Sequence, residues 1–132
     1  MPGDLGSFLQ IGVVVFAHGS RVESANEAVR SVARQLSAAG GFSHVEAAFL
    51  ELGQPDLATA VGNLAAKGLR QVVVLPYFLT LGLHMERDLP RLIADISNKN
   101  NNLEILVAPT LDGHPGLVEA LLSRVYSSLN KT

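Results

Sequence analysis

Cysteine is absent from this chain of 132 residues. Its absence excludes disulfides, thiolate metal sites, iron–sulfur clusters and a cysteine nucleophile. Any metal bound by this chain must therefore use nitrogen and oxygen ligands.

An excess of charge of either sign is also absent. Lysine and arginine together number 10 and aspartate and glutamate 12, so the formal net charge is −2. Such a balance lacks the excess of positive charge that attracts nucleic acid or an anionic membrane. We therefore expect small molecules or protein partners, with no nucleic acid and no membrane among them.

Long apolar runs are missing as well. No run approaches the roughly 20 residues that span a membrane, and the first ten residues lack the charged start and apolar core of a signal peptide. We expect a cytoplasmic protein, and a plastid location after removal of a transit peptide stays open. The sequence also lacks GxGxxG, Walker and GxSxG patterns, which disfavours nucleotide-binding and esterase functions.

Short apolar runs alternate with stretches of helical periodicity along the chain, which is typical of βα units on a parallel sheet. The length suits one domain, which we expect over residues 11–130 after a flexible lead at residues 1–10. Right-handed crossovers favour a three-layer α/β fold with a four-stranded parallel, flavodoxin-like sheet of order 2-1-3-4. The expected strands are Ile11–Ala17, Val45–Leu50, Gln71–Leu75 and Glu104–Ala108.

Local signals predict where the helices begin. Ser20 followed by Glu23 is a candidate capping box for the first helix, and Pro55 is expected in the first turn of the second. Pro90 lacks an amide hydrogen and fits a first turn, so the third helix is expected to begin at Asp88. The connection from Tyr77 to Asp88 is then long, and long ordered loops in compact domains are often functional.

Helical periodicity also predicts which face of each helix is apolar. For the first helix that face comprises Val22, Ala25, Val29, Val32 and Leu36. For the other three helices the expected apolar positions are Leu57, Val61, Leu64 and Ala65, then Leu89, Leu92, Ile93 and Ile96, and finally Leu117, Leu121, Val125 and Leu129.

Three residues with metal-ligating side chains lie at equal intervals, each at the end of an apolar run: His18, Glu51 and His84. In open α/β sheets, ligands bind outside the carboxyl ends of the strands. Two imidazoles and one carboxylate suit iron, cobalt, nickel or zinc and leave coordination positions open. The spacing therefore predicts a metal site at this edge of the sheet.

Simpler interpretations of these residues stay open. His18 can be a buried, hydrogen-bonded histidine with Ser20 only a helix cap, and Glu51 can be an ordinary loop charge. Glu86, Arg87 and Asp88 fit a solvated first turn of a helix. His44 precedes the second strand, at the opposite end of the sheet, and is excluded from the site. His114 either reaches the site or simply begins the last helix.

Three segments together resemble the small CbiX-type chelatases, which are class II chelatases that insert a metal into sirohydrochlorin: VVVFAHGSR at Val13–Arg21, FLEL at Phe49–Leu52 and LPYFLTLGLHMERDLP at Leu75–Pro90. The resemblance implies catalytic roles for His18 and His84, and metal binding by these two residues and Glu51. It implies Co²⁺ or Fe²⁺ as the metal substrate, with Ni²⁺ still open, and no permanently bound cofactor.

The implied tetrapyrrole is a polycarboxylate, so its site should offer cations and hydrogen-bond donors. Ser20, Arg21 and Arg87 adjoin the motifs and are candidates, although both arginines can equally be ordinary exposed residues. Larger relatives contain two such modules in one chain, so the resemblance implies a homodimer here. Two alternatives remain: a metal or tetrapyrrole carrier, and a partner-binding domain without chemistry.

Overall fold

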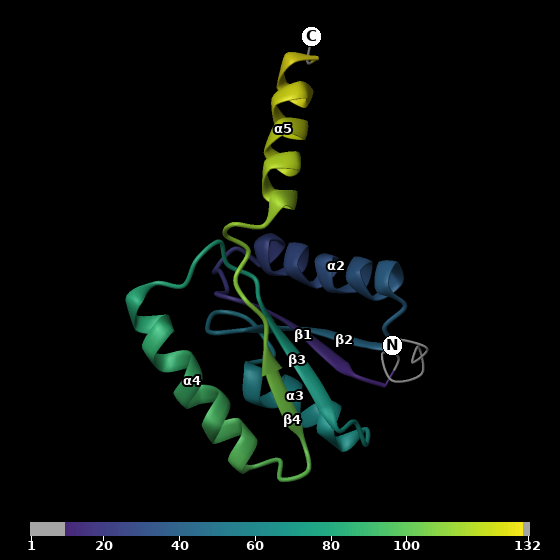
Figure 1. Ribbon diagram of the computed structural model, residues 1–132, viewed down its shortest axis with the longest axis vertical. Coiled ribbons are helices and arrows are strands. Elements are labelled where there is room, and N and C mark those ends of the chain that lie inside the picture. The colour runs from purple at the N-terminus through teal and green to yellow at the C-terminus, as the bar shows by residue number, and fades with distance from the viewer. Residues whose placement is uncertain (1–9, 131–132) are drawn as a thin grey trace.

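The computed structural model describes residues 10–130, in which four strands alternate with four helices (Figure 1). The expected flexible lead at residues 1–10 lies, except for Gln10, outside the described residues. In chain order the elements are β1 (Gly12–Ala17), α2 (Glu23–Gly40), β2 (His44–Phe49), α3 (Leu57–Ala66), β3 (Gln71–Pro76), α4 (Leu83–Asn98), β4 (Glu104–Val107) and α5 (Pro115–Leu129).

All four strands are parallel and lie in the order β2-β1-β3-β4, which confirms the predicted topology. β1 is flanked on both sides and is buried along its whole length. In the register, Val13 is opposite Val45 of β2 and Val73 of β3, and Val73 is opposite Leu106 of β4. The carboxyl ends of β1, β2 and β3 therefore lie together at one edge.

Alternation along β1 divides the core between the two faces of the sheet. Val14 and Phe16 pack with residues of α3 and α4, whereas Val15 and Ala17 pack with Val29 of α2. Full burial of an aliphatic or phenyl side chain contributes about 1.5–3 kcal/mol relative to exposure. Helices on both faces thus give the three layers that were predicted.

The start of α2 differs from the predicted capping box. Val22 occupies the N-cap without a side-chain hydrogen bond, and the amide of Ser20 donates instead to Oδ1 of Asn26 at 2.9 Å. The carboxylate of Glu23 is engaged by Arg30 and Asn26, so it does not reach back to Ser20. The Ser20–Glu23 capping box was therefore wrong.

The buried face of α2 is also rotated from the predicted one. Asn26, Val29 and Ala33 are its buried residues, whereas Val22 is 60% exposed and Ala25 is exposed as well. Asn26 is a polar residue that forms hydrogen bonds to the adjoining loops. It lies on the buried face of α2, where the apolar pattern had placed Val22 and Ala25.

The second helix was expected to start near Pro55, and α3 starts two residues later, so Pro55 precedes its first turn. The helix begins at Leu57, after a cis Gln54–Pro55 peptide, and Asp56 is its N-cap, with the amide of Thr59 donating to the carboxylate at 2.8 Å. Leu57, Val61 and Leu64 are buried as the periodicity predicts.

The predicted start of α4 at Asp88 was also wrong, because the helix begins at Leu83 and contains Pro90 in its interior. Proline removes one helical donor, which leaves the carbonyl of Glu86 without its usual partner. Both Pro90 and Glu86 are exposed, so water can satisfy that carbonyl. The connection after β3 is therefore short, and His84 lies in the first turn of α4.

The last helix, α5, extends away from the rest of the molecule (Figure 1). None of its residues from Pro115 to Leu129 is buried. Among residues 10–130, no helix combines the length and apolar character needed to cross a membrane.

Candidate functional site

Hydrogen bonds hold together the segments that leave β1, β2 and β3. The amide of Leu50 donates to the carbonyl of Ala17 at 2.9 Å, and the amide of Tyr77 donates to that of Phe16 at 2.7 Å. Strand-like pairing thus continues beyond the sheet. This pairing fixes the points at which the loops that carry His18 and Phe78 leave the sheet.

His18 and Glu51 form a pair across the first two of these loops. Nδ1 of His18 lies 3.8 Å from Oε2 of Glu51, and the two side chains are 59% and 57% exposed. The backbone amide of Glu51 also donates to the carbonyl of His18 at 3.1 Å. This close approach requires Gly19, whose φ is +98° and where a Cβ would overlap the carbonyl of Glu51. His18 is thus exposed, contrary to the buried alternative.

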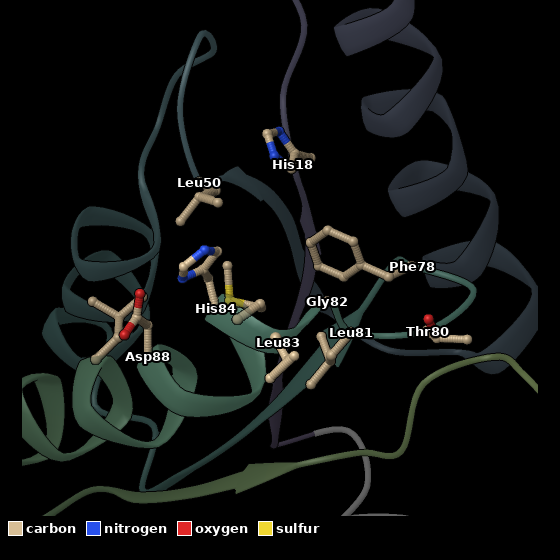
Figure 2. A pocket seen from close by; sticks show the side chains of 11 residues that line it. His18, Leu50, Phe78, Thr80, Leu81, Gly82, Leu83, His84 and Asp88 are labelled. Atoms are coloured by element: carbon tan, nitrogen blue, oxygen red, sulfur yellow. The ribbon is translucent and has the colours of Figure 1, made fainter.

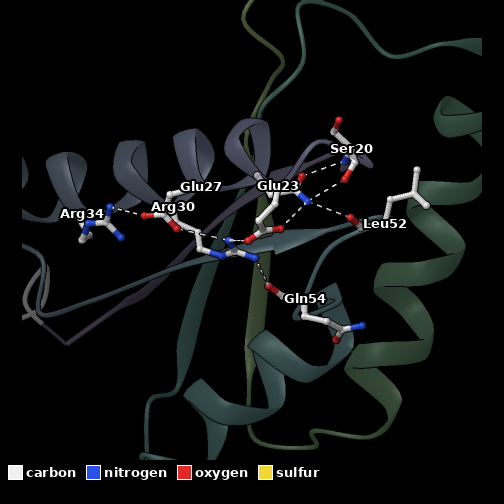
Figure 3. Close-up of polar contacts among 8 residues, drawn as sticks. Ser20, Glu23, Glu27, Arg30, Arg34, Leu52 and Gln54 are labelled. Carbon is white, nitrogen blue, oxygen red and sulfur yellow. Dashed lines mark hydrogen bonds and ion pairs between the residues drawn. The ribbon is translucent and has the colours of Figure 1, made fainter.

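Asn26 of α2 connects the same two loops through the backbone of Ser20 and Leu52, two residues that Figure 3 shows. Asn26 is only 2% exposed. The side-chain amide donates to the carbonyls of Ser20 at 2.8 Å and Leu52 at 2.9 Å, and Oδ1 accepts from the amide of Ser20. One buried amide therefore satisfies backbone groups on both sides of the His18–Glu51 pair.

Arg30 holds the rest of the β2–α3 loop (Figure 3). It donates to Glu23 at 2.6 Å and to the carbonyl of Gln54 at 3.1 Å, and its guanidinium lies 5.2 Å from the centroid of the Phe49 ring. The hydrogen bond from Arg30 lowers the pKa of Glu23, and a further one from Asn26 acts in the same direction. These contacts restrain the loop that carries Glu51.

A cleft of about 610 Å³ contains both His18 and His84 in its lining. Figure 2 shows the two imidazoles around this cleft, with Leu50 and Phe78 also at its walls. His18 comes from the loop after β1 and His84 from the first turn of α4, so separate elements supply them. The remaining lining residues are Thr80, Leu81, Gly82, Leu83, Met85, Asp88 and Leu92.

Most of the cleft wall is apolar. The ring of Phe78 meets the imidazole of His18 edge to face at a centroid distance of 6.5 Å, and it packs against Phe16 at 6.1 Å. This contact braces His18 at the cleft although the side chain is exposed. An apolar cleft with two imidazoles suits an organic ligand whose reacting atoms need nitrogen ligands or proton acceptors.

The predicted ligands are only partly brought together. His18 and His84 share the cleft, and Glu51 adjoins His18 but is not among the lining residues. Within residues 10–130, no group of three or more histidines, aspartates or glutamates is arranged to hold a metal ion. The structure therefore presents an imidazole–carboxylate pair and a second imidazole rather than a closed three-ligand centre.

The weaker candidates lie outside the cleft lining. Ser20 accepts a hydrogen bond from the amide of Val22 at 3.0 Å, so its hydroxyl stabilises a turn. Arg21 and Arg87 are exposed and do not line the cleft.

The other two histidines have positions of their own. His44 begins β2, at the end of the sheet opposite to His18. His114 is the N-cap of α5, and its Nδ1 accepts a hydrogen bond from the amide of Gly116 at 2.9 Å. This cap supports the simpler of the two interpretations of His114.

Sequence reasoning missed several residues of the site, namely Asn26, Leu50, Phe78, Met85 and Asp88. A signal existed for Asp88, because it lies four residues after His84 and shares its face of a helix that begins at Leu83. The signal for Asn26 was a polar side chain at helical spacing from Val29 and Ala33, which are buried. The contact of Phe78 with His18 depends on loop geometry and had no sequence signal.

Comparison with known proteins gives concordant matches. The CbiX family model matches residues 12–128. A sirohydrochlorin cobaltochelatase of Saccharolobus islandicus is 34% identical over 127 residues, which cover 92% of this chain and 98% of that protein. The sirohydrochlorin cobaltochelatase of Methanopyrus kandleri is 28% identical, with 92% and 99% covered.

Solved structures share the fold. The putative cobalamin biosynthesis CbiX protein of Marinobacter aquaeolei has a TM-score of 0.81 at 25% identity, covering 92% of this chain and 99% of that one. The sirohydrochlorin chelatase SirB of Bacillus subtilis in complex with cobalt has a TM-score of 0.81 at 23% identity, and the match covers 89% of this chain but 50% of SirB. Taken with the match over residues 12–128, these likenesses show that the chain belongs to the CbiX family.

Proposed function

We propose that this protein is a sirohydrochlorin chelatase that inserts Co²⁺ or Fe²⁺ into the macrocycle. The observation that carries the proposal is the presence of two imidazoles, His18 and His84, in one apolar cleft of a CbiX-family chain. Relatives named as sirohydrochlorin cobaltochelatases support this activity and favour cobalt.

The reaction requires a base on the protein. A divalent metal enters the macrocycle as two pyrrole N–H protons leave, so the products are the metallated tetrapyrrole and two protons. A neutral imidazole can accept a proton, and it can also bind a divalent metal. We assign both tasks to His18 and His84: delivery of the metal and acceptance of the pyrrole protons.

Glu51 assists His18 in this proposal. Its carboxylate, 3.8 Å from Nδ1 of His18, stabilises the imidazolium that forms when His18 accepts a proton, and it can also contribute an oxygen ligand to the metal. Arg21, Arg87 and Ser20 lie near the two motifs, and we assign them weaker contacts with the carboxylates of the substrate.

We further propose that the protein acts as a homodimer. This chain matches half the length of SirB, so two copies supply the amount of structure that SirB has in one chain. A cleft in one small domain covers a macrocycle only in part, and a second copy can complete the enclosure.

A metal or tetrapyrrole carrier is the alternative function, because the same scaffold and ligands bind without necessarily turning over. A nickel-inserting chelatase is the alternative among enzymes, since two imidazoles and a carboxylate do not separate these metals by ligand type alone.

The test follows sirohydrochlorin absorbance under anaerobic conditions, with Co²⁺, Fe²⁺ or Ni²⁺ and catalytic amounts of protein. The wild type should complete many turnovers, fastest with the physiological metal. His18→Ala and His84→Ala should each lose at least about 100-fold in rate, in the range that loss of a general base costs. His44→Gln is the matched control, and its rate should equal that of the wild type.

Two results would contradict the proposed chelatase activity. Insertion no faster than the spontaneous rate, with retained tetrapyrrole binding, would favour the carrier. Absence of both metal and tetrapyrrole binding in the wild type would favour a partner-binding domain without chemistry.

A further inference from the structure

The two imidazoles of the cleft differ in how they are held. Nδ1 of His18 lies 3.8 Å from the carboxylate of Glu51, and its ring meets that of Phe78 edge to face at 6.5 Å. His84 is exposed, and none of the ion pairs and aromatic contacts among residues 10–130 involves it. The orientation of the His84 ring is therefore not fixed by such contacts.

A histidine that binds a metal needs a second contact to fix its ring. Such a residue almost always donates its other ring N–H to a carboxylate, a backbone carbonyl or water, and this contact sets both the tautomer and the ring orientation. Glu51 lies where it can serve His18 in this way. An acceptor for His84 has to come from close to the first turn of α4, where His84 lies.

Asp88 lies one turn further along α4, four residues after His84. Side chains at this spacing are neighbours, with Cβ atoms about 5–6 Å apart. His84, Asp88 and Leu92 recur at this interval, and all three line the cleft, so one stripe of α4 forms part of its wall. In Figure 2 the side chains of His84 and Asp88 project from neighbouring turns of this helix. Among the described residues that line the cleft, Asp88 is the one carboxylate.

Asp88 performs neither of the usual tasks of an acid in a helix. Gly82 is the N-cap of α4 and Glu86 is the acid of its first turn, whereas Asp88 lies beyond the turn in which an acid best complements the helix dipole. Arg91 follows at a spacing that allows ion pairs. Yet none of the ion pairs and side-chain hydrogen bonds among residues 10–130 involves Asp88. Its carboxylate is thus available to another donor.

We propose that Asp88 is a positioning residue for His84. Its carboxylate accepts a hydrogen bond from one ring N–H and thereby directs the other ring nitrogen into the cleft. The two side chains are both exposed and are not paired here, so the contact forms by side-chain rotation on a fixed helix. The inference rests on the proposed function, in which His84 binds the metal. Each imidazole of the cleft then has one carboxylate, Glu51 for His18 and Asp88 for His84.

Binding of Co²⁺ to the protein alone tests this role without the tetrapyrrole. Asp88→Ala should weaken binding about 10-fold or more, in the range for outer partners of metal-binding histidines. Alanine is the better helix former, so a weaker α4 cannot explain the loss. Asp95→Ala, another exposed aspartate of α4 but outside the cleft lining, is the matched control and should bind like the wild type. Asp88→Asn keeps an acceptor oxygen and should bind more tightly than Asp88→Ala. Equal affinities of these two variants would overturn the hydrogen bond.

Combination with histidine variants tests whether Asp88 acts through His84. In a His18→Ala protein, which retains His84, Asp88→Ala should again weaken Co²⁺ binding about 10-fold. In a His84→Ala protein the same change should alter binding by less than about 2-fold, as for uncoupled sites. Titrations followed by NMR can measure the weak affinities of these variants. Equal losses in the two backgrounds, or no loss in either, would overturn the positioning role.

The insertion assay separates this inference from the chelatase function. A wild type that inserts the metal, together with an Asp88→Ala variant that binds Co²⁺ equally well, would overturn the positioning role alone. A wild type that shows the expected dependence of Co²⁺ binding on Asp88 and His84, yet inserts no metal, would overturn the chelatase activity and support the positioning role.

Discussion

The backbone amide of Glu51 donates a hydrogen bond to the carbonyl of His18 at 3.1 Å, and their side chains lie 3.8 Å apart from Oε2 to Nδ1. The two residues belong to loops that follow neighbouring parallel strands. Their separation is therefore fixed by the sheet and by the loop backbone rather than by the exposed side chains. Changes to either loop should reach both residues.

Glu51→Gln should weaken metal delivery without unfolding the protein. The amide keeps the shape of the side chain but cannot stabilise a protonated His18, so we expect the insertion rate to fall about 10-fold, as for outer partners of metal-binding histidines. Initial rates against Co²⁺ concentration would measure this. Glu119→Gln on α5 removes an equal charge far from the cleft and should change nothing. An unchanged rate for Glu51→Gln would make Glu51 an ordinary loop charge.

Gly19→Ala should destabilise the protein by about 2 kcal/mol or more, because the residue has φ of +98° and its Cβ would overlap the carbonyl of Glu51. Gly62→Ala is the contrasting variant. A Cβ at Gly62, inside α3, meets no atom within 4 Å, so alanine should stabilise the helix by about 0.5–1 kcal/mol. Urea denaturation would measure both. Tolerance of Gly19→Ala would mean that the two loops separate readily.

Asn26→Ala should cost about 1–3 kcal/mol, since it leaves backbone groups of Ser20 and Leu52 without their partners. Hydrogen exchange should also accelerate at the amide of Ser20, which donates to Asn26 at 2.9 Å. Asn63→Ala, on the exposed side of α3, is the control and should be nearly neutral. Equal losses in the two variants would show that Asn26 does not hold the loops.

Asp56→Ala should remove about 1 kcal/mol by deleting the N-cap of α3. Hydrogen bonds from the side chain and then the backbone of Thr59 lower the pKa of Asp56 from its ordinary value of 3.8. The carboxylate therefore stabilises the fold fully above that value, and this contribution is lost as pH falls through the lowered pKa. Urea denaturation from pH 7 to pH 3 should show the difference from the wild type shrinking only at the acid end. A constant difference would contradict this origin, and Asp95→Ala on α4 is the control.

The strand order was predictable because it depends on features that are local in sequence. Apolar runs marked β1 to β4, and the handedness of crossovers then left few arrangements. The pairing of His18 with Glu51 followed from the same logic, since carboxyl ends of neighbouring parallel strands are adjacent.

The residues at which the helices begin were harder to predict, because competing sequence signals for a helix start were close in strength. Pro90 indicated a first turn at Asp88. The carbonyl of Glu86 that Pro90 leaves without a donor belongs to an exposed residue, however, so the loss costs less than it would in a buried helix. The earlier start at Leu83 is what brings His84 and Asp88 onto one face. The position of α5 was beyond sequence reasoning, because an apolar side predicts a covered helix without saying which chain covers it.

The lack of buried residues in α5 also bears on the order in which the protein folds. An isolated helix of 15 residues is only marginally stable in water, so α5 should be frayed until something packs against it. The sheet precedes α5 along the chain and can form first, with Val73, Leu75 and Leu106 uncovered during synthesis. The last residues to be made would therefore also be the last to fold, and the exposed apolar side chains of α5 would be available for aggregation throughout that interval.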